Sequence, residues 1–279
     1  MVVLTALLHL ALACTVGIGC TRLWRDQARS AALRRWHVAA PLLAMLISAV
    51  MLVLHSAAMA EAPLLASGEA VWSMLSATHL GLAWWIGLGA LSVAAGAACL
   101  HGRGAVLASL AGMAVFCYSR SMVSHAASQG DISVPMLADW VHLMSMAVWT
   151  GAVIAGALVS GRLHGAEWPG YGAALSRWAT IGLCGVVLSG VASAWHNLGG
   201  SVVLPASAYG AVLVVKLMLV AVAVALGAYN RFAVLPLLSD PQTGAAAARR
   251  FRLVLRIEAL VLCGVLVAAA VLSSTAPLG

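Results

Sequence analysis

The chain has 279 residues, of which 63% are hydrophobic and only 8% are charged. A soluble domain carries about 25% charged residues, so this composition excludes a soluble enzyme, a disordered chain and a nucleic-acid-binding protein. A chain of this length cannot bury so much apolar surface in a core, so part of that surface must face lipid. The formal net charge is +7, and most of the basic residues lie in short loops between apolar runs, where they report membrane orientation.

Eight apolar runs are long enough to cross a bilayer as helices, which needs roughly 20 residues each. They are rich in Ala, Leu, Val and Gly and lack the two-residue alternation of a membrane β-barrel. The runs lie at 2–21, 37–60, 76–100, 104–127, 135–160, 173–197, 208–234 and 251–273. The sequence therefore predicts an all-α, polytopic membrane helical bundle of about eight transmembrane helices. The first run has no basic segment before it, so we interpret it as a span and not as a signal peptide.

The loops between these runs alternate between basic and acidic. The basic residues of the first, third, fifth and seventh loops are Arg22, Arg25, Arg29, Arg34, Arg35, Arg103, Arg162, Arg231, Arg249, Arg250 and Arg252. The other loops carry Glu61 and Glu69, then Asp131, then no charge. Basic loops stay in the cytoplasm, so both termini are expected in the periplasm of a bacterial inner membrane.

The chain divides into an N-terminal transmembrane half at 1–114, with spans one to three and the start of span four, and a second region at 115–279. Short similarities relate the two. His9 and Gly17 in the first span resemble His142 and Gly151 in the fifth in their sequence surroundings. His55 at the end of the second span has a counterpart in His125 at the end of the fourth. A four-plus-four duplication would explain both similarities.

Four ionisable residues lie inside the predicted spans, where charge is costly and usually faces a partner or a pathway. Arg120, Asp139 and Lys216 fall in the outer half, and a pair of Asp139 with either base would reduce the cost of burial. Structural pairing and a functional role are equal alternatives for these three. For Glu258 we expect a local structural ion pair with Arg256.

Histidine and methionine gather in the outer part of the spans and repeat at helical spacing. Met136, Asp139, His142, Met146 and Trp149 form one stripe, and Met51, His55 and Met59 form another. Thioethers suit Cu(I), and imidazole binds copper in either oxidation state. The candidate metal ligands are His125, His142, His55, Met51, Met59, Met122, Met146, Asp139, His79, His9 and His196.

Other interpretations remain open. A methionine stripe is usually packing, and a single buried histidine is usually a hydrogen-bonded core residue, so the case for a site depends on several histidines from different helices at one depth. Four cysteines near mid-membrane are expected to be small inert hydrophobes, with a relay for a soft cation as the alternative: Cys14, Cys117, Cys184 and Cys263. Pairs among His55, His125 and His142 are also possible axial ligands of haem b.

The second half resembles the copper resistance D (CopD) family of bacterial inner-membrane proteins over roughly residues 115–275. The segments that carry the resemblance are 124–126 (SHA), 139–143 (DWVHL), 149–151 (WTG), 189–190 (SG), 209–217 (YGAVLVVKL) and 226–232 (LGAYNRF). The first half matches only loosely, around residues 78–84. His125, His142, Asp139 and Lys216 fall on family motif positions, and the resemblance implies the two histidines as ligands.

The resemblance also implies a function, which is movement of copper from periplasm to cytoplasm, often beside a separate periplasmic carrier of the CopC type. The sequence has no ATPase motif, so we expect passive or ion-coupled copper transport and no enzyme activity. The haem-binding membrane cytochrome is the first alternative, and a metal-free structural or assembly protein is the second. The lipid bilayer is a partner in each case.

Overall fold

A computed structural model describes residues 1–24, 31–61, 63–64, 67–163, 167–197 and 208–275, and all regular structure in these ranges is helical. The long helices are α1 (Val2–Trp24), α2 (Ala31–Met59), α4 (His79–Cys99), α5 (Arg103–Ser121), α6 (Val134–Val159), α7 (Trp168–Asn197), α8 (Ala208–Tyr229) and α9 (Gly244–Ser274). The shorter ones are α3 (Gly68–Ala77), η3 (His125–Gln129), η4 (Ser160–Arg162), η6 (Asn230–Val234) and η7 (Leu235–Ser239). The predicted all-α class is confirmed.

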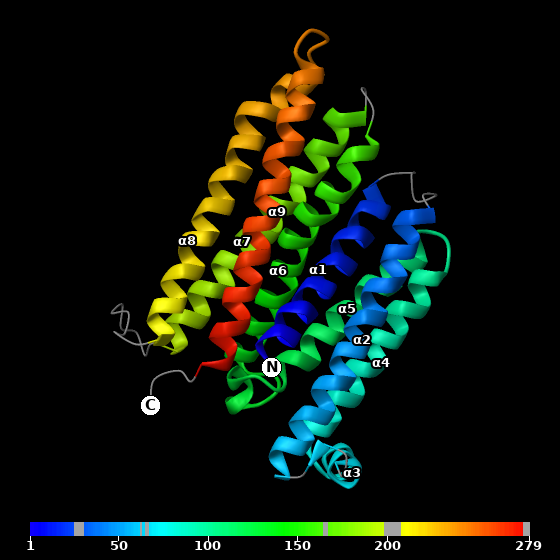
Figure 1. Cartoon of the computed structure of the whole chain (residues 1–279), viewed down its shortest axis with the longest axis vertical. Coiled ribbons are helices and arrows are strands. Elements are labelled where there is room, and N and C mark those ends of the chain that lie inside the picture. Colours follow the sequence, from blue (N-terminus) through cyan, green and yellow to red (C-terminus); the bar gives the residue numbers. More distant parts are fainter. Residues whose placement is uncertain (25–30, 62, 65–66, 164–166, 198–207, 276–279) are drawn as a thin grey trace.

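The long helices run alternately up and down in one bundle, and both termini lie at the same end (Figure 1). We name this end the terminal end; α3 and η3 also lie there. The opposite end, named the basic end, holds Arg34, Arg103, Arg162 and Arg249 at or near helix ends. The positive-inside rule therefore predicts that the basic end faces the cytoplasm.

Seven of the described helices are long and apolar enough to cross a membrane. The eighth long helix, α5, falls short because Arg103 and Arg120 lower its hydropathy. It packs along α4 and returns the chain to the terminal end (Figure 1). With both termini at one end, α5 takes the position of the fourth of the eight predicted spans (Figure 1).

Helices extend further at the basic end than the apolar runs alone predict. The second begins at Ala31 and not at residue 37, and the last begins at Gly244 and not at residue 251. Several arginines that were expected in loops are therefore helical: Arg34, Arg35, Arg249, Arg250 and Arg252. Arginine is a good helix former, and its long side chain can keep the guanidinium in water. Glu69, also expected in a loop, lies in the first turn of α3, where a negative charge suits the helix dipole.

The bundle has two apolar cores that meet at the contact between α1 and α6. One core lies mainly among α1, α2, α4 and α5 and includes Ala147 of α6. The other lies mainly among α6, α7, α8 and α9 and includes Ile18 of α1 and Leu33 of α2. At the junction, a Cβ added to Gly17 would overlap the backbone of Gly151, so two glycines let the helices touch. Both helices start at the terminal end and therefore run parallel.

The packing partners in the two halves correspond. The pair α1–α2 matches α6–α7, α4–α5 matches α8–α9, and α1–α5 matches α6–α9. This arrangement agrees with a four-plus-four duplication. One pair breaks the correspondence, because α2 packs along α4 whereas α7 and α8 share no comparable contact.

An irregular turn joins α8 to α9. It passes through the π-helical η6 and the 3-10 helix η7 before Asp240. The Asp240 carboxylate accepts hydrogen bonds of 2.8 Å from the backbone N–H of Gln242 and from the Thr243 hydroxyl. These hydrogen bonds lower the pKa of Asp240 and fix the start of α9.

Candidate metal centre

Two histidines lie at the same depth on the parallel helices α1 and α6. His9 and His142 both precede the Gly17–Gly151 contact, and a rise of 1.5 Å per residue places each about 12–14 Å from it toward the terminal end. The two rings are within electrostatic range of each other. His9 Nδ1 is buried and has no hydrogen-bond partner. These are two of the predicted ligands that the structure brings together.

A hydrogen-bond chain fixes the tautomer of His142. The Ser189 hydroxyl of α7 donates to the Gly185 carbonyl at 2.5 Å, so at 3.1 Å from His142 Nδ1 it accepts the ring N–H. The lone pair of His142 then lies on Nε2, which is the nitrogen left to bind a metal. Such outer partners orient metal-binding histidines in many sites.

Three charged residues surround this pair. Asp139 lies one turn before His142 on α6, and it is within electrostatic range of Arg120 on α5 and Lys216 on α8. Both cations also act on His9, and Lys216 acts on His142. Within the described residues Asp139 makes no direct ion pair with either base. The expected pairing is therefore an electrostatic attraction at longer range, without contact between the charged groups. The surroundings of the two imidazoles carry a net positive charge.

Ser121 and Ser124, at the end of α5 and just beyond it, face the Asp139 carboxylate. Ser121 Oγ makes no hydrogen bond of standard geometry, while Ser124 Oγ donates to the Ser121 carbonyl at 2.9 Å. The carboxylate is therefore approached by hydroxyls as well as by cations.

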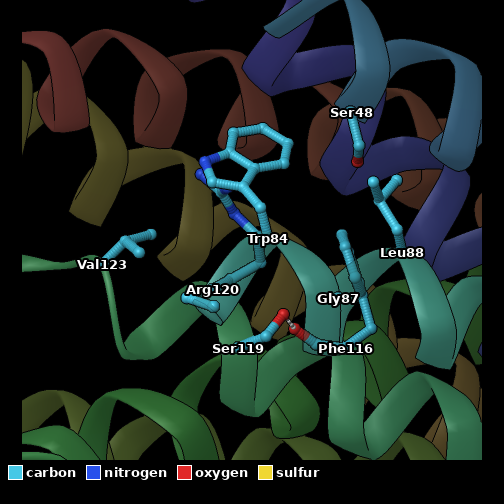
Figure 2. A pocket seen from close by; sticks show the side chains of 9 residues that line it. Ser48, Trp84, Gly87, Leu88, Phe116, Ser119, Arg120 and Val123 are labelled. Atoms are coloured by element: carbon cyan, nitrogen blue, oxygen red, sulfur yellow. Dashed lines mark hydrogen bonds between the residues drawn. The ribbon is translucent and has the colours of Figure 1, made fainter. Parts of the chain in front are cut away.

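A second group lies between α2, α4 and α5. His55 Nδ1 donates to the Met51 carbonyl at 2.8 Å, which leaves Nε2 with its lone pair. Its ring centre lies 6.3 Å from that of Trp84. Figure 2 shows Arg120 beside Trp84, with the guanidinium 5.4 Å from the Trp84 ring centre. The cavity beside Trp84 and Arg120 measures about 10 Å³, close to the minimum for one water molecule. This space is far too small for a porphyrin.

The remaining candidates do not converge on these groups. His79 is half exposed and pairs with Asp131 at 2.7 Å at the terminal end, and the Met59 side chain is 66% exposed. Met122 is buried in a separate small apolar cluster, and Met146 packs on the N-terminal core. The side chains of His125 in η3 and His196 in α7 lie outside the described part of the structure.

No group of three or more His, Cys, Asp or Glu side chains suited to a metal ion occurs among the described residues. What the structure supplies is pairs of donors: two imidazoles at α1–α6, and a thioether-bearing Met51 beside His55 on α2. Two donors are few for a resident metal.

One polar pair that the sequence did not suggest joins α1 to α2 at the basic end. The Arg22 guanidinium donates to His37 Nδ1 at 2.5 Å, and both side chains are buried, with 5% and 0% exposure. Ser109 of α5 lies 3.4 Å from the other ring nitrogen. The sequence feature that could have indicated this contact is that both residues lie at the cytoplasmic ends of two consecutive predicted spans.

The expected ion pair of Glu258 with Arg256 is wrong. Glu258 is 3% exposed in the middle of α9, whereas the Arg256 side chain is exposed. Residues two positions apart on a helix point to different faces, so this pair cannot form locally.

The fold and these polar groups define a multi-pass, all-α membrane protein with histidines and charges in its interior. Comparison with known families then identifies it. The family model described as Copper resistance protein D matches residues 171–272, and the one described as Copper resistance protein D-like, N-terminal domain matches residues 1–134. The chain belongs to the copper resistance protein D family. The N-terminal match extends the resemblance to the half that its sequence motifs supported only loosely. No curated protein and no solved structure matches the chain.

Proposed function

We propose that this chain carries copper across the bacterial inner membrane, from the periplasm at the terminal end to the cytoplasm at the basic end. The observation that carries the proposal is the pair of imidazoles, His9 and His142, at one depth on the parallel helices α1 and α6. The family name supports copper as the ion. Nδ1 of His9 has no hydrogen-bond partner, and the contact of Ser189 with Nδ1 of His142 leaves Nε2 as the metal-binding nitrogen of that ring in this proposal.

Copper would approach this pair from the terminal end. In this proposal Met51 and His55 of α2 bind the incoming ion first. His125 of η3 and His196 of α7 are further ligands on the same route. Met59, Met122 and His79 lie further out, and a separate carrier of the CopC type would deliver copper there. Met146 lies one turn deeper than His142 on α6 and is the next donor inward in this proposal. Asp139 attracts the ion toward the pair.

The nearby cations set the strength of binding. Arg120 and Lys216 repel a metal ion at His9, and Asp139 offsets only one of their two charges. Conduction requires a site that is favourable enough to fill and weak enough to empty. A two-histidine site in a positive field meets that requirement better than a tight resident centre.

A Cu(I) titration of the purified protein against a competing chelator tests the proposal. His9→Ala and His142→Ala should each weaken binding at least tenfold, because each removes one of two nitrogen donors. His101→Ala is the matched control, since His101 is exposed at the basic end, where its ring nitrogen pairs with Arg34. Equal affinities in all three variants would refute the site.

Transport itself needs a second readout. Proteoliposomes or cells that contain the protein should accumulate more copper than those with His142→Ala. A purified protein that is red, shows a Soret band and retains iron would instead support a cytochrome and overturn the proposal. Binding with unchanged uptake would contradict transport while leaving the metal site in place.

A further inference from the structure

A second cavity belongs to none of the groups above. It measures about 360 Å³ and lies toward the basic end, with walls from α6, α7, α8, η6 and α9. It occupies the place where α7 and α8 lack the contact that α2 and α4 make in the other half. The broken correspondence between the halves therefore leaves an opening between two helices that border the membrane.

One carboxyl group lines this cavity. Glu258 projects from the middle of α9 and forms no hydrogen bond or ion pair with any other described residue. Gly227 of α8 lies opposite it, and a Cβ built there would come within 3.1 Å of Glu258 Oε1. The absence of a side chain at residue 227 gives the carboxyl its space.

The remaining polar lining lies closer to the basic end. Asn230 Oδ1 is buried without a partner. Arg231 is the one other charged residue on the cavity walls, and its guanidinium is held by the Thr180 hydroxyl at 2.7 Å and the Ser176 hydroxyl at 3.1 Å. Arg231 is exposed and lies nearer the basic end than Glu258, so the polar lining extends from the carboxyl group toward that end.

The chemistry of this lining selects a proton over other occupants. An ionised carboxylate with no counter-charge is very costly to keep among apolar walls, so the empty cavity favours the carboxylic acid. A sodium or calcium ion needs a shell of several oxygen ligands, and the free oxygens here are those of Glu258 and Asn230. The volume has room for several water molecules, which can connect Glu258 to the basic end.

Glu258 and the histidine pair are also connected along the bundle. Cys14 of α1 and Cys263 of α9 are within electrostatic range of each other, midway between the two sites. The helical rise from Glu258 to Cys263, and from Cys14 to His9, gives the separation of the two sites an axial component of about 15 Å. Across such a distance in an apolar interior, a charge gained at one site is felt at the other.

We propose that Glu258 is a proton-exchange site, served from the basic end by the cavity between α7 and α8, and that copper binding at His9 and His142 releases its proton. The Glu258 O–H bond breaks, the proton passes to water at the basic end, and the carboxylate offsets the charge of the incoming ion. When copper leaves, the carboxylate takes up a proton again. The coupling to copper depends on the proposed function, whereas the proton site does not.

Carbodiimide labelling tests the proton site without copper. A lipophilic carbodiimide adds the carboxylic O–H across one of its C=N bonds, and the acyl group then migrates to nitrogen, so the peptide gains the whole reagent mass. Mass spectrometry should find this adduct at Glu258 and not at the exposed Glu61 or Glu69. Ala179→Phe, which fills the cavity from α7, should reduce labelling severalfold. Leu188→Phe, on the lipid-facing side of the same helix, should not.

Proton release tests the coupling. Cu(I) loading in weakly buffered detergent, followed with a pH dye, should release about one more proton per copper from the wild type than from Glu258→Gln at equal copper occupancy. Equal release overturns the coupling, and the absence of labelling at Glu258 overturns the proton site. If the wild type binds no copper, the copper-transport proposal fails, and the labelling result decides the proton site alone.

Discussion

Gly17 of α1 and Gly151 of α6 touch backbone to backbone at the centre of the bundle. A Cβ on either residue would overlap main-chain atoms of the other helix: the Gly151 carbonyl in one case and the Ala13 carbonyl in the other. Small residues that let membrane helices approach closely are a recurrent means of packing in lipid. Because these helices are parallel, the same contact also sets the separation of His9 and His142 on the terminal side.

Gly151→Ala should therefore damage both stability and copper binding. Its methyl group meets backbone, which cannot move aside, so we expect a loss of about 1–3 kcal/mol in the free energy of unfolding. Thermal unfolding in detergent, followed by tryptophan fluorescence, measures this loss. Gly89→Ala in α4 is the control, because no atom lies within 4 Å of its added Cβ and alanine favours helix. Equal stability of the two variants would contradict the central role of the glycine contact.

The sequence predicts the bundle well because lipid imposes a strong rule on composition. Apolar runs and basic loops yield the helix class, the shared end of the termini and the eight long helices, with some helix ends displaced by six or seven residues. The similarity around His9–Gly17 and His142–Gly151 indicated that the two glycines occupy equivalent positions in the two halves. That they touch each other could not be predicted, because it depends on α1 packing beside α6.

The candidate site was less accessible to sequence reasoning. Depth along a helix can be counted, but the face of the helix cannot be read when nearly every residue is apolar, so Met59 and His79 were grouped with buried residues. The role of Ser189 depends on a neighbouring helix, and no periodicity within α6 reveals it. Glu258 and Arg256 are close in sequence, and only the rotation of α9 separates them.

Ser189→Ala should weaken copper binding without removing a ligand. The hydroxyl accepts the His142 Nδ1–H, and its loss frees the ring to rotate or to change tautomer. Loss of such an outer partner typically costs 10–100-fold in metal affinity, and we expect the lower part of that range. The Cu(I) titration described above measures it. Ser92→Ala, at an exposed position on α4, is the matched control and should bind like the wild type. Unchanged affinity in Ser189→Ala would show that His142 needs no such support.

Lys216→Met should strengthen copper binding. The ammonium group of Lys216 acts on His9, His142 and Asp139, so removing it lowers the repulsion felt by a metal ion between the imidazoles. We expect an increase in affinity of about tenfold, or ~1.4 kcal/mol, together with slower copper release in transport assays. Asp139→Asn should act in the opposite direction. Weaker binding in Lys216→Met would mean that the lysine orders the site more than it repels the ion.

The buried pair of Arg22 and His37 should contribute far more to stability than an exposed pair of the same residue types. His37→Leu leaves a buried guanidinium without its acceptor, and we expect a loss of about 3 kcal/mol in the free energy of unfolding. Arg22→Met removes the charge itself, so the double variant should lose less than the sum of the single variants. The exposed Arg34–His101 pair, at 3.2 Å near the same end, provides the control, because His101→Leu should cost at most about 0.5 kcal/mol. A double-mutant cycle by thermal or denaturant unfolding measures both pairs. Equal coupling energies in the two cycles would show that burial does not strengthen the Arg22–His37 contact.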